Sequence, residues 1–288
     1  MKALIDGDIL VYKCGFACEK LLYYRVYFTS FREGFMCNLP EGLSRKEVTE
    51  YVKSRWSKEI VGKVKPIYQL EPIEHALYLT KNLIKKILDD TQCDEYRVYL
   101  SASDKSNFRY NVATIKPYKG HRAKMKKPFH YQDIVDYLIK YHKAIVIFGE
   151  EADDAMGKDH AEDTVICTTD KDMRQLPGKF YNLDWRQKGL QMIEDIPELG
   201  YLSLTKGEKY SLIGGGLMWF YAQMLLGDSA DNIPGIPRMG VVSTYNALKD
   251  CKTEKEMQDV VLSKYKKHYK EKYKEALKEI KQLLWIRR

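Results

Sequence analysis

The chain has 288 residues and a mass of 33.7 kDa, which is enough for one large domain or two modest ones. Hydrophobic residues make up 44% of it, yet no apolar run approaches the roughly 20 residues of a membrane helix, which argues against a membrane protein. The 48 basic and 40 acidic residues give a net charge of +8, which is compatible with a polyanionic partner without identifying one.

Short apolar runs, each bounded by polar residues or Gly, are typical of buried strands. They lie at Ala3–Ile5, Arg97–Leu100, Ala144–Phe148 and Thr164–Cys167, with a weaker one at Phe180–Leu183. Helical spacing of apolar residues predicts helices over 74–88 and 131–141. Strands that alternate with helices predict an α/β fold with a mostly parallel sheet. Residues 21–65 show no clean periodicity and receive no assignment.

From about Ser211 the pattern changes to helix and turn, so we expect an α/β domain over 1–210 and a helical region over 211–288. Leu217–Leu226 is strongly apolar and is followed by a Pro- and Gly-rich stretch, Ile233–Gly240. Tyrosines spaced four apart in Tyr265–Lys281 favour a solvated amphipathic helix over a direct DNA contact. The run Gly214–Gly216 has no role that the sequence reveals.

The cysteines and the start of the chain bear on the compartment. Six scattered cysteines lack the spacing of a zinc site and indicate reduced thiols. The first apolar run is too short for a signal peptide. We therefore expect a cytoplasmic protein, in the host cytoplasm if the source is viral.

Acidic residues follow each of the four stronger strands. They are Asp6 and Asp8, then Asp104, then Glu150, Glu151, Asp153 and Asp154, then Asp170 and Asp172, with a later pair at Asp228 and Asp231. The carboxyl ends of parallel strands meet at one edge of the sheet, so these side chains are expected to lie together. A single acid after a strand usually caps a helix or turn, and this simpler role stays open for Asp8, Glu150 and Asp184. The repetition favours a metal pocket.

Such a cluster needs cations. Two unit charges about 4 Å apart repel by roughly 4 kcal/mol at an effective dielectric near 20. Oxygen ligands without organised His or Cys select hard ions, which favours Mg²⁺ or Mn²⁺. Two such ions about 3.5–4 Å apart can stabilise the attacking and leaving oxygens of a phosphoryl displacement.

The segment from Lys105 to Lys127 contains no acid. Its cations are Lys105, Arg109, Lys116, Lys119, Arg122, Lys124, Lys126 and Lys127. This composition suits a nucleic-acid strand, whose binding would weaken steeply with salt. The alternative is a solvated basic loop.

Six motifs in order resemble one family. They are Leu4–Asp8; Asp104 with Asn107–Arg109; Tyr118–Arg122; Glu151–Asp154; Thr169–Asp172; and Gly227–Pro237. Together they resemble the 5′ nuclease superfamily: phage 5′–3′ exonucleases, the 5′-nuclease domain of bacterial DNA polymerase I and flap endonucleases. The length and the short ending look most like the stand-alone phage exonucleases. The resemblance implies a PIN-like central sheet flanked by helices, a helical arch or gateway over about 105–128, and a C-terminal helix–three-turn–helix DNA-binding region.

The resemblance also implies roles for individual residues. Two Mg²⁺ (or Mn²⁺) ions would be held, the first by Asp6, Asp104, Glu151, Asp153 and Asp154, the second by Asp170, Asp172, Asp228 and Asp231. Lys119 and Arg122 would steady the scissile phosphate, helped by Arg109. Tyr118 would stack on a base, and Lys116, Lys124 and Lys127 would contact the DNA.

The stretch from Gly235 to Gly240 matches the hairpin of the family's C-terminal motif. There Gly235, Ile236 and Gly240 would approach a duplex phosphate, with a K⁺ ion at the hairpin. The family usually has Pro-Lys after the second Gly, whereas this chain has Val241-Val242. One phosphate-contacting cation is therefore missing.

These features predict a metal-dependent 5′-to-3′ exodeoxyribonuclease, a phosphodiester hydrolase, that also cuts 5′ flaps and removes RNA primers in DNA replication and repair. No Ser-His or Cys-His pair is organised, so water rather than a protein nucleophile is expected to attack. The expected partner is DNA with 5′ ends, flaps or an RNA-primed duplex, and the sequence does not reveal which proteins, if any, bind the chain. A toxin-type PIN ribonuclease shares the acids but does not explain the hairpin or gateway. A non-catalytic, metal-dependent DNA-binding protein would have lost some of the acids.

Overall fold

The computed structural model describes residues 1–29, 36–120, 125–183 and 193–288. The chain forms two compact units. The large unit comprises Met1–Leu10, Asn82–Lys126 and Asp136–Arg288, and the small unit comprises Val11–Lys81 and Lys127–Val135. The domain boundary expected at residue 210 stays a prediction.

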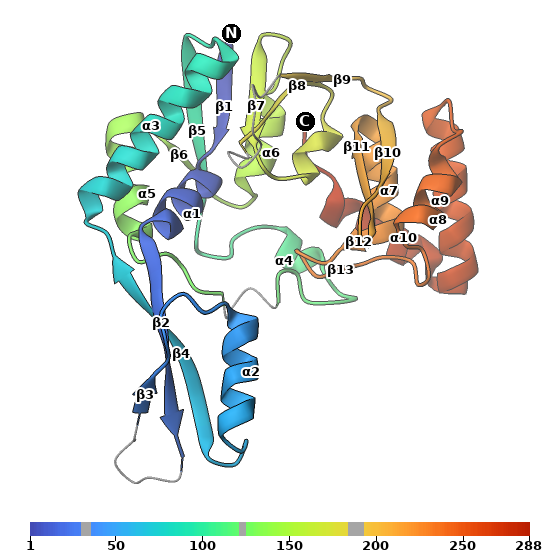
Figure 1. The fold of residues 1–288 in the computed structure, drawn as a ribbon. Helices are drawn as coiled ribbons and strands as arrows, with labels where there is room; N and C mark the ends of the chain where they lie inside the picture. Colours follow the sequence, from blue (N-terminus) through green and yellow to red (C-terminus); the bar gives the residue numbers. More distant parts are fainter. Residues whose placement is uncertain (30–35, 121–124, 184–192) are drawn as a thin grey trace. The chain divides into compact units, whose positions relative to one another are not determined.

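A six-stranded sheet lies at the centre of the large unit (Figure 1). Its strand order is β6-β5-β1-β7-β8-β9, and only β9 is antiparallel to its neighbour. The strands are β1 (Lys2–Asp6), β5 (Glu95–Ser101), β6 (Ile145–Ile147), β7 (Thr164–Thr168), β8 (Gly178–Asn182) and β9 (Glu194–Ile196). The first five coincide with the five apolar runs, which confirms the mostly parallel α/β sheet. Because β7 is buried at every position, it reads as a continuous apolar run in the sequence.

The expected helices are present beside these strands. The helices α1 (Gly7–Ala17), α3 (Ile73–Thr91) and α5 (Tyr131–His142) run through both units, and the last two confirm the helical spacing. In the large unit, α6 (Ala152–Asp159) buries Ala152 and Met156 against the side chains of Leu4, Tyr99 and Ile166 on the sheet. The start of α6 is thereby fixed near the carboxyl end of β1.

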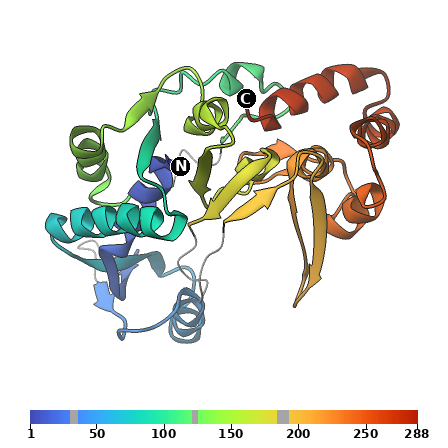
Figure 2. The same ribbon diagram turned by 90° about the horizontal axis from the view of Figure 1, so that it is seen from above.

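The C-terminal half of the large unit combines one hairpin with helices. The strands β10 (Tyr201–Lys206) and β11 (Tyr210–Gly215) form a separate two-stranded ribbon next to α7 (Gly216–Leu226) and α8 (Val241–Leu248) (Figure 2). The short pair β12 (Gly227–Asp228) and β13 (Ile233–Pro234) joins α7 to α8. The 3₁₀ turns η2 (Asp172–Gln175) and η3 (Lys270–Lys272) and the helices α9 (Glu254–Tyr269) and α10 (Tyr273–Leu284) complete it.

Two features of this half were not foreseen. The run Gly214–Gly216 ends β11 and begins α7, and a Cβ on Gly214 would lie 2.7 Å from the Tyr201 carbonyl oxygen. The tyrosine stripe is only partly solvated: Tyr265 is fully buried and its hydroxyl donates to the Met224 carbonyl oxygen at 2.8 Å, whereas Tyr269 and Tyr273 stay partly exposed. The helix also breaks at Lys270, where φ is +50°. Tyr265 is buried because α7 is apolar all round and must be covered.

Residues 21–65, which had no assignment, lie in the small unit. There β2 (Glu19–Phe28), β3 (Met36–Asn38) and β4 (Val61–Leu70) form an antiparallel sheet of order β3-β2-β4. The helix α2 (Arg45–Arg55) packs on one face of it through Val48, which contacts the cluster of Val26, Phe28 and Leu39. Ser44 and Glu47 form a capping box that fixes the start of this helix. None of the helices in the described parts of the chain is long and apolar enough to cross a membrane.

Candidate metal centre

The first acid of the site follows the central strand. Asp6 ends β1, which pairs with β5 on one side and β7 on the other. Its Oδ1 accepts from the backbone N–H of Ile9 at 3.1 Å, and its Oδ2 accepts from the Thr168 hydroxyl at 2.6 Å. Burial raises the pKa of Asp6 to about 7, and the carboxylates of Asp8 and Asp170 act in the same direction. A cation at this carboxylate would replace the proton that burial favours.

Asp8, for which the sequence also left open a simple turn role, lies beside the carboxyl ends of β1 and β5. It occupies the first turn of α1, and its carboxylate accepts from the Ser101 backbone N–H at 3.2 Å. Burial raises its pKa, with a further contribution from Glu151. The Asp-Gly-Asp spacing was the available signal, because it brings both acids to the end of one strand.

The acids at the start of α6 have different surroundings. Burial raises the pKa of Asp153 well above its usual value, and Asp170 and Asp6 raise it further. Asp154, in contrast, is bound by both terminal nitrogens of Arg109, one of them at 2.9 Å from Oδ1. Burial raises the pKa of Asp154, but the hydrogen bonds and charge of Arg109 outweigh burial and hold it below the usual range.

Arg109 belongs to this buried pair. Its side chain is 1% exposed, and its Nε and a terminal nitrogen also donate to the carbonyl oxygens of Leu283 and Trp285, both at 2.9 Å. All its polar contacts are thus internal to the large unit. Its expected help in catalysis stays a prediction, and the geometry is that of a structural tie between α6 and the end of α10.

Lys119 and Tyr118 contact two further acids of the site, Glu151 and Asp231. The Lys119 ammonium is ion-paired with Glu151 and lies 3.7 Å from Oδ2 of Asp231. The Tyr118 hydroxyl donates to Asp231 at 2.6 Å, and its ring is 4% exposed. The ring therefore presents no free face for the base stacking that the resemblance implies. Lys119 has φ of +50°, an uncommon conformation that is fixed by its backbone N–H, which donates to the Asp231 carbonyl oxygen at 2.9 Å.

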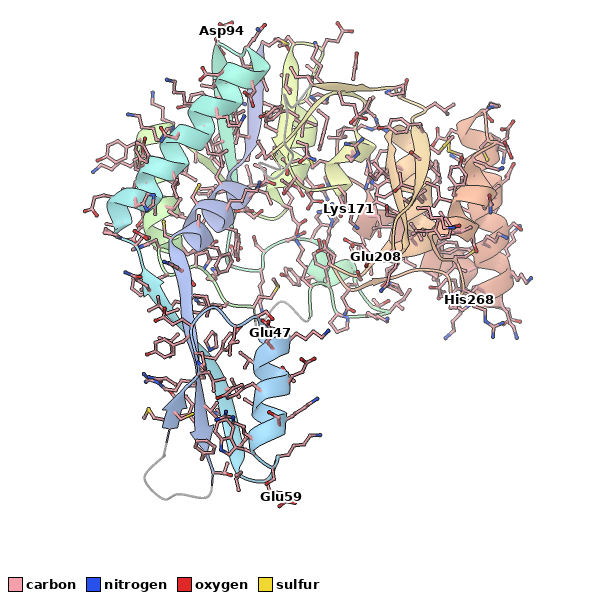
Figure 3. All side chains as sticks on the ribbon, in the orientation of Figure 1. Glu47, Glu59, Asp94, Lys171, Glu208 and His268 are labelled. Carbon is pink, nitrogen blue, oxygen red and sulfur yellow. The ribbon has the colours of Figure 1, made fainter. Side chains whose placement is uncertain are left out.

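The later acids form a compact group. Single carboxylate oxygens of Asp172, Asp228 and Asp231 lie within 4.8 Å of one another. Burial raises the pKa of Asp172 well above its usual value, with Asp170 and Asp228 adding to it. Lys171 partly offsets the charge, because its ammonium lies 2.9 Å from Asp228 and 3.8 Å from Asp172 (Figure 3). Three carboxylates at this separation suit one hard divalent ion.

Asp170 is electrostatically coupled with both sets of acids. Its pKa is raised by burial and then by Asp231 and Asp228, and it in turn raises the pKa values of Asp6 and Asp153. Its side chain accepts from the Asp172 backbone N–H at 2.8 Å. The sequence-predicted acids of β1, α6, η2 and β12 therefore form one electrostatic cluster.

Asp104 is the predicted ligand that the structure does not bring into this cluster. It lies in an exposed turn, where it accepts from the Ser106 backbone N–H at 3.0 Å. Its pKa is lowered by the hydrogen bonds from Ser106. Within the described ranges, no hydrogen bond or ion pair joins it to another predicted ligand.

Supporting polar residues were missed by the sequence reasoning. Thr168 donates to Asp6, and the side-chain nitrogen of Gln223 donates to Asp172. Gln223 is the one polar, hydrogen-bonding amide in the apolar segment Leu217–Leu226. That isolated amide was a usable signal, since a buried polar group must be hydrogen-bonded.

The basic segment is only partly described. Arg122 and Lys124 lie outside the described residues. In the described positions 105–120 and 125–128, the single helix is the one-turn α4 (Arg109–Val112). Lys116 is exposed in the large unit, and Lys127 of the small unit lies 4.0 Å from the centre of the Tyr131 ring. Their DNA contacts stay predictions.

The hairpin residues have distinct surroundings. A Cβ on Gly235 would lie 2.1 Å from the Leu226 carbonyl oxygen, so Gly is required there by internal packing. Ile236 is buried and its N–H donates to Leu225 at 2.8 Å. Gly240 directly precedes α8, and no atom lies within 4 Å of the position that a Cβ would take there. Contact of this hairpin with DNA and K⁺ remains a prediction.

No family model matches the chain. It is 30% identical over 186 residues to a 5′-3′ exonuclease of Buchnera aphidicola from Schizaphis graminum, covering 60% of this chain and 59% of that protein. It is also 28% identical over 188 residues to DNA polymerase I of Geobacillus stearothermophilus, covering 62% of this chain and 20% of the polymerase. By sequence, the chain is similar to 5′-3′ exonucleases and to DNA polymerase I. The resemblance that the six motifs indicated is thereby confirmed.

A solved structure that aligns with nearly the whole chain is the T5 D15 protein crystallised with metal ions. It aligns with 98% of this chain and 88% of its own at 14% identity and a TM-score of 0.46. Of the two sequence relatives, the chain spans about three fifths (59%) of the Buchnera exonuclease and a fifth (20%) of the polymerase. The α/β assignment stands on the strand order of the sheet itself.

Proposed function

We propose that the chain is a divalent-metal-dependent nuclease that hydrolyses DNA at or near 5′ ends. The observation that carries this proposal is the convergence of buried carboxylates from β1, α6, η2 and β12, among which burial raises the pKa values of Asp6, Asp153 and Asp172. Carboxylates kept in such positions need cations, and an all-oxygen set selects Mg²⁺ or Mn²⁺. The sequence similarity to 5′-3′ exonucleases supports the same reaction class.

The residues present fit two ions. Asp6, Glu151 and Asp153 would hold the first, and Asp172, Asp228 and Asp231 would hold the second, with Asp170 between them. Asp104 and Asp154 remain proposed members of the first set. Bound there, the ions supply the positive charge that stabilises the attacking and leaving oxygens of an in-line displacement.

The chain's own cations complete the chemistry. Lys119 neutralises Glu151 and Asp231, and a metal ion at these carboxylates would free its ammonium to hold the scissile phosphate. Its left-handed backbone and its hydrogen bond to Asp231 keep the ammonium next to the acids. Arg122 is proposed to act beside it. Water is the nucleophile, and the product carries a 5′ phosphate.

The substrate range follows from the relatives. The 5′-3′ exonuclease and DNA polymerase I relatives favour 5′-to-3′ exonucleolysis, with 5′ flaps and RNA-primed ends as further substrates, in DNA replication and repair. Action in the cytoplasm and a K⁺ ion at the hairpin are parts of the same proposal.

The test is a product ladder from DNA labelled separately at each end. The substrates are a blunt duplex, a 5′ flap, an RNA-primed duplex and a single-stranded RNA, each with Mg²⁺ or EDTA. Short products from the 5′ label that need Mg²⁺ are expected, and their lengths separate exonuclease from flap cutting. Cleavage of the RNA alone would instead favour the PIN ribonuclease. Binding without any cleavage would leave a metal-dependent DNA-binding protein.

A further inference from the structure

The small unit contains a cleft between α2 and β4 with a volume of about 530 Å³. Pockets that hold small organic ligands span roughly 300–1,000 Å³, so this cleft is large enough for a planar ring. Its walls are apolar and aromatic, with Val48 and Val52 from α2, Val64 from β4, and the rings of Tyr24 and Trp56. Tyr68 stands at its rim and is 37% exposed.

The cleft exists because α2 covers only part of the sheet. The helix packs on β2 through Val48, whereas Val64 on the neighbouring edge strand β4 remains 37% exposed. The Trp56 ring is fixed from behind by edge contacts, 5.2 Å from Phe28 and 6.3 Å from Tyr51 between ring centres. A rigid aromatic wall next to exposed apolar side chains is a surface suited to stacking.

Charge on the cleft has one sign. The charged residues that line it are Arg45, Lys53 and Lys58, and the described lining includes no acid. Along α2 the lining positions recur at helical spacing, and the acids Glu47 and Glu50 fall between them (Glu47 is labelled in Figure 3). Glu47 is also engaged in the capping box with Ser44. The helix therefore presents its cations, and not its acids, to the cleft.

The outer face of β4 is positive as well. Lys65 stands directly opposite Arg25 in the register of β2 and β4, and Lys63 stands opposite Tyr27. Like charges directly opposite each other destabilise a sheet, so this pairing favours a bound anion. The strand contains no acid over its whole length. Cations on both sides of one edge strand suit a polyanion that passes along it.

We propose that the cleft between α2 and β4 binds a base of a single-stranded nucleic acid, while the surrounding cations contact its phosphates. The base stacks among Tyr24, Trp56 and Tyr68, which accept any base because every base has a π face. Paired bases are stacked inside a duplex and cannot enter, so the site selects unpaired strand. This inference rests on the proposed function for the class of ligand, because it takes the substrate to be a nucleic acid.

The test measures binding in EDTA, where no cleavage can occur. A fluorescent thymidine strand of about twelve nucleotides, within the usual site size, is titrated by anisotropy against the full chain. An abasic strand with the same number of phosphates is titrated in parallel. The variants are Tyr68→Ala and Lys53→Ala/Lys58→Ala. The matched controls are Tyr78→Ala and Lys81→Ala/Lys85→Ala on α3, whose side chains are outside the cleft. Thermal unfolding verifies that every variant is folded.

Tyr68→Ala is expected to weaken binding of the thymidine strand about tenfold and to leave the abasic strand unchanged. The lysine pair is expected to reduce the slope of log K against log salt by about 1.4, and the controls to match the wild type. Equal affinity of the wild type for both strands, or a Tyr68→Ala affinity equal to that of Tyr78→Ala, would overturn the base pocket. A wild type that binds in this way but cuts nothing in Mg²⁺ would reject the proposed function and support the pocket.

Discussion

Replacing Arg109 by Met should destabilise the large unit strongly, because it leaves the buried carboxylate of Asp154 without its ion-pair partner. Asp154 is fully buried, and two of its hydrogen bonds come from Arg109. Removing one partner of such a pair costs about 3–5 kcal/mol, whereas whole proteins are stable by about 5–15 kcal/mol. The loss of the two hydrogen bonds to Leu283 and Trp285 acts in the same direction. At a urea m value of about 3 kcal/mol/M, the unfolding midpoint should fall by roughly 1–2 M.

A second variant, Arg109→Met/Asp154→Asn, removes both charges of the pair and is compared with the single variant Arg109→Met. An amide removes the buried negative charge and can still accept from the backbone N–H of Arg287, which lies 3.1 Å from Oδ1 of Asp154. The double variant should therefore be more stable than Arg109→Met by about 2 kcal/mol. Urea unfolding followed by circular dichroism gives all the values. A single variant that loses under about 1 kcal/mol, or a double variant no more stable than the single one, would refute the buried-charge reasoning.

The same two variants separate structure from catalysis. If Arg109 acts only as a tie, cleavage by Arg109→Met should fall in proportion to the unfolded fraction. A larger loss of kcat at full folding would restore the catalytic role that the resemblance implies. The stability of the folded protein at low pH provides a further measurement. The pKa of Asp154 is lowered in the folded protein, so its pairing with Arg109 stabilises the fold at pH values above the unfolded pKa of about 3.9. That stabilisation is lost as the pH falls through the lowered pKa of the folded protein.

The remaining predictions concern the acids. Asp153→Asn should cost several orders of magnitude in cleavage rate and keep DNA binding in Ca²⁺, and near-normal cutting would contradict the two-ion assignment. Lys119→Ala should slow cleavage strongly, while Mg²⁺ binding by calorimetry is retained. The pKa of Asp6 is raised to about 7, so metal-free stability should fall between about pH 4 and 7, because the carboxyl of the unfolded chain ionises there while the native one still holds its proton. Mg²⁺ should raise Tm more at pH 8 than at pH 5, and an equal shift would argue against metal binding there. Thr168→Val removes a hydrogen bond that lowers the pKa of Asp6, so the acid limb of the pH–rate profile should move upward.

The strands of the large unit were predictable because they are buried on both faces. β7 has no exposed position and therefore appears as a plain apolar run that is bounded by turns. The acids at strand ends were predictable because parallel strands bring their carboxyl ends to one edge of the sheet.

The small unit was not predictable, because its strands have no simple alternation. β4 is exposed at nearly every position and includes Pro66, which is tolerated only because β4 is an edge strand. In β2 both faces carry tyrosine, and an irregularity between Leu21 and Tyr23 shifts the register. Neither strand therefore gives a periodic signal.

The burial of Tyr265 and the ion-pair partner of Arg109 depend on tertiary contacts and could not be predicted from the sequence. A tyrosine stripe on a charged helix suggests solvent, but α7 is apolar all round and requires cover, which Tyr265 supplies. An arginine in an acid-free basic segment suggests phosphate, but its partner Asp154 lies 45 residues away in sequence. Composition around a residue cannot reveal such a partner.

The carboxylates of the site differ in how their charge is already balanced, and this difference determines what metal binding must do. Asp6, Asp153 and Asp170 form no ion pair among the described residues, and burial raises the pKa of each. A cation that binds them displaces protons, so affinity should rise with pH. Glu151 and Asp228 are instead paired with Lys119 and Lys171. A cation there displaces ammonium groups, which remain tethered beside the site. A metal ion bound in the pocket would therefore release Lys119 from Glu151, and the proposed function assigns that freed ammonium to the scissile phosphate.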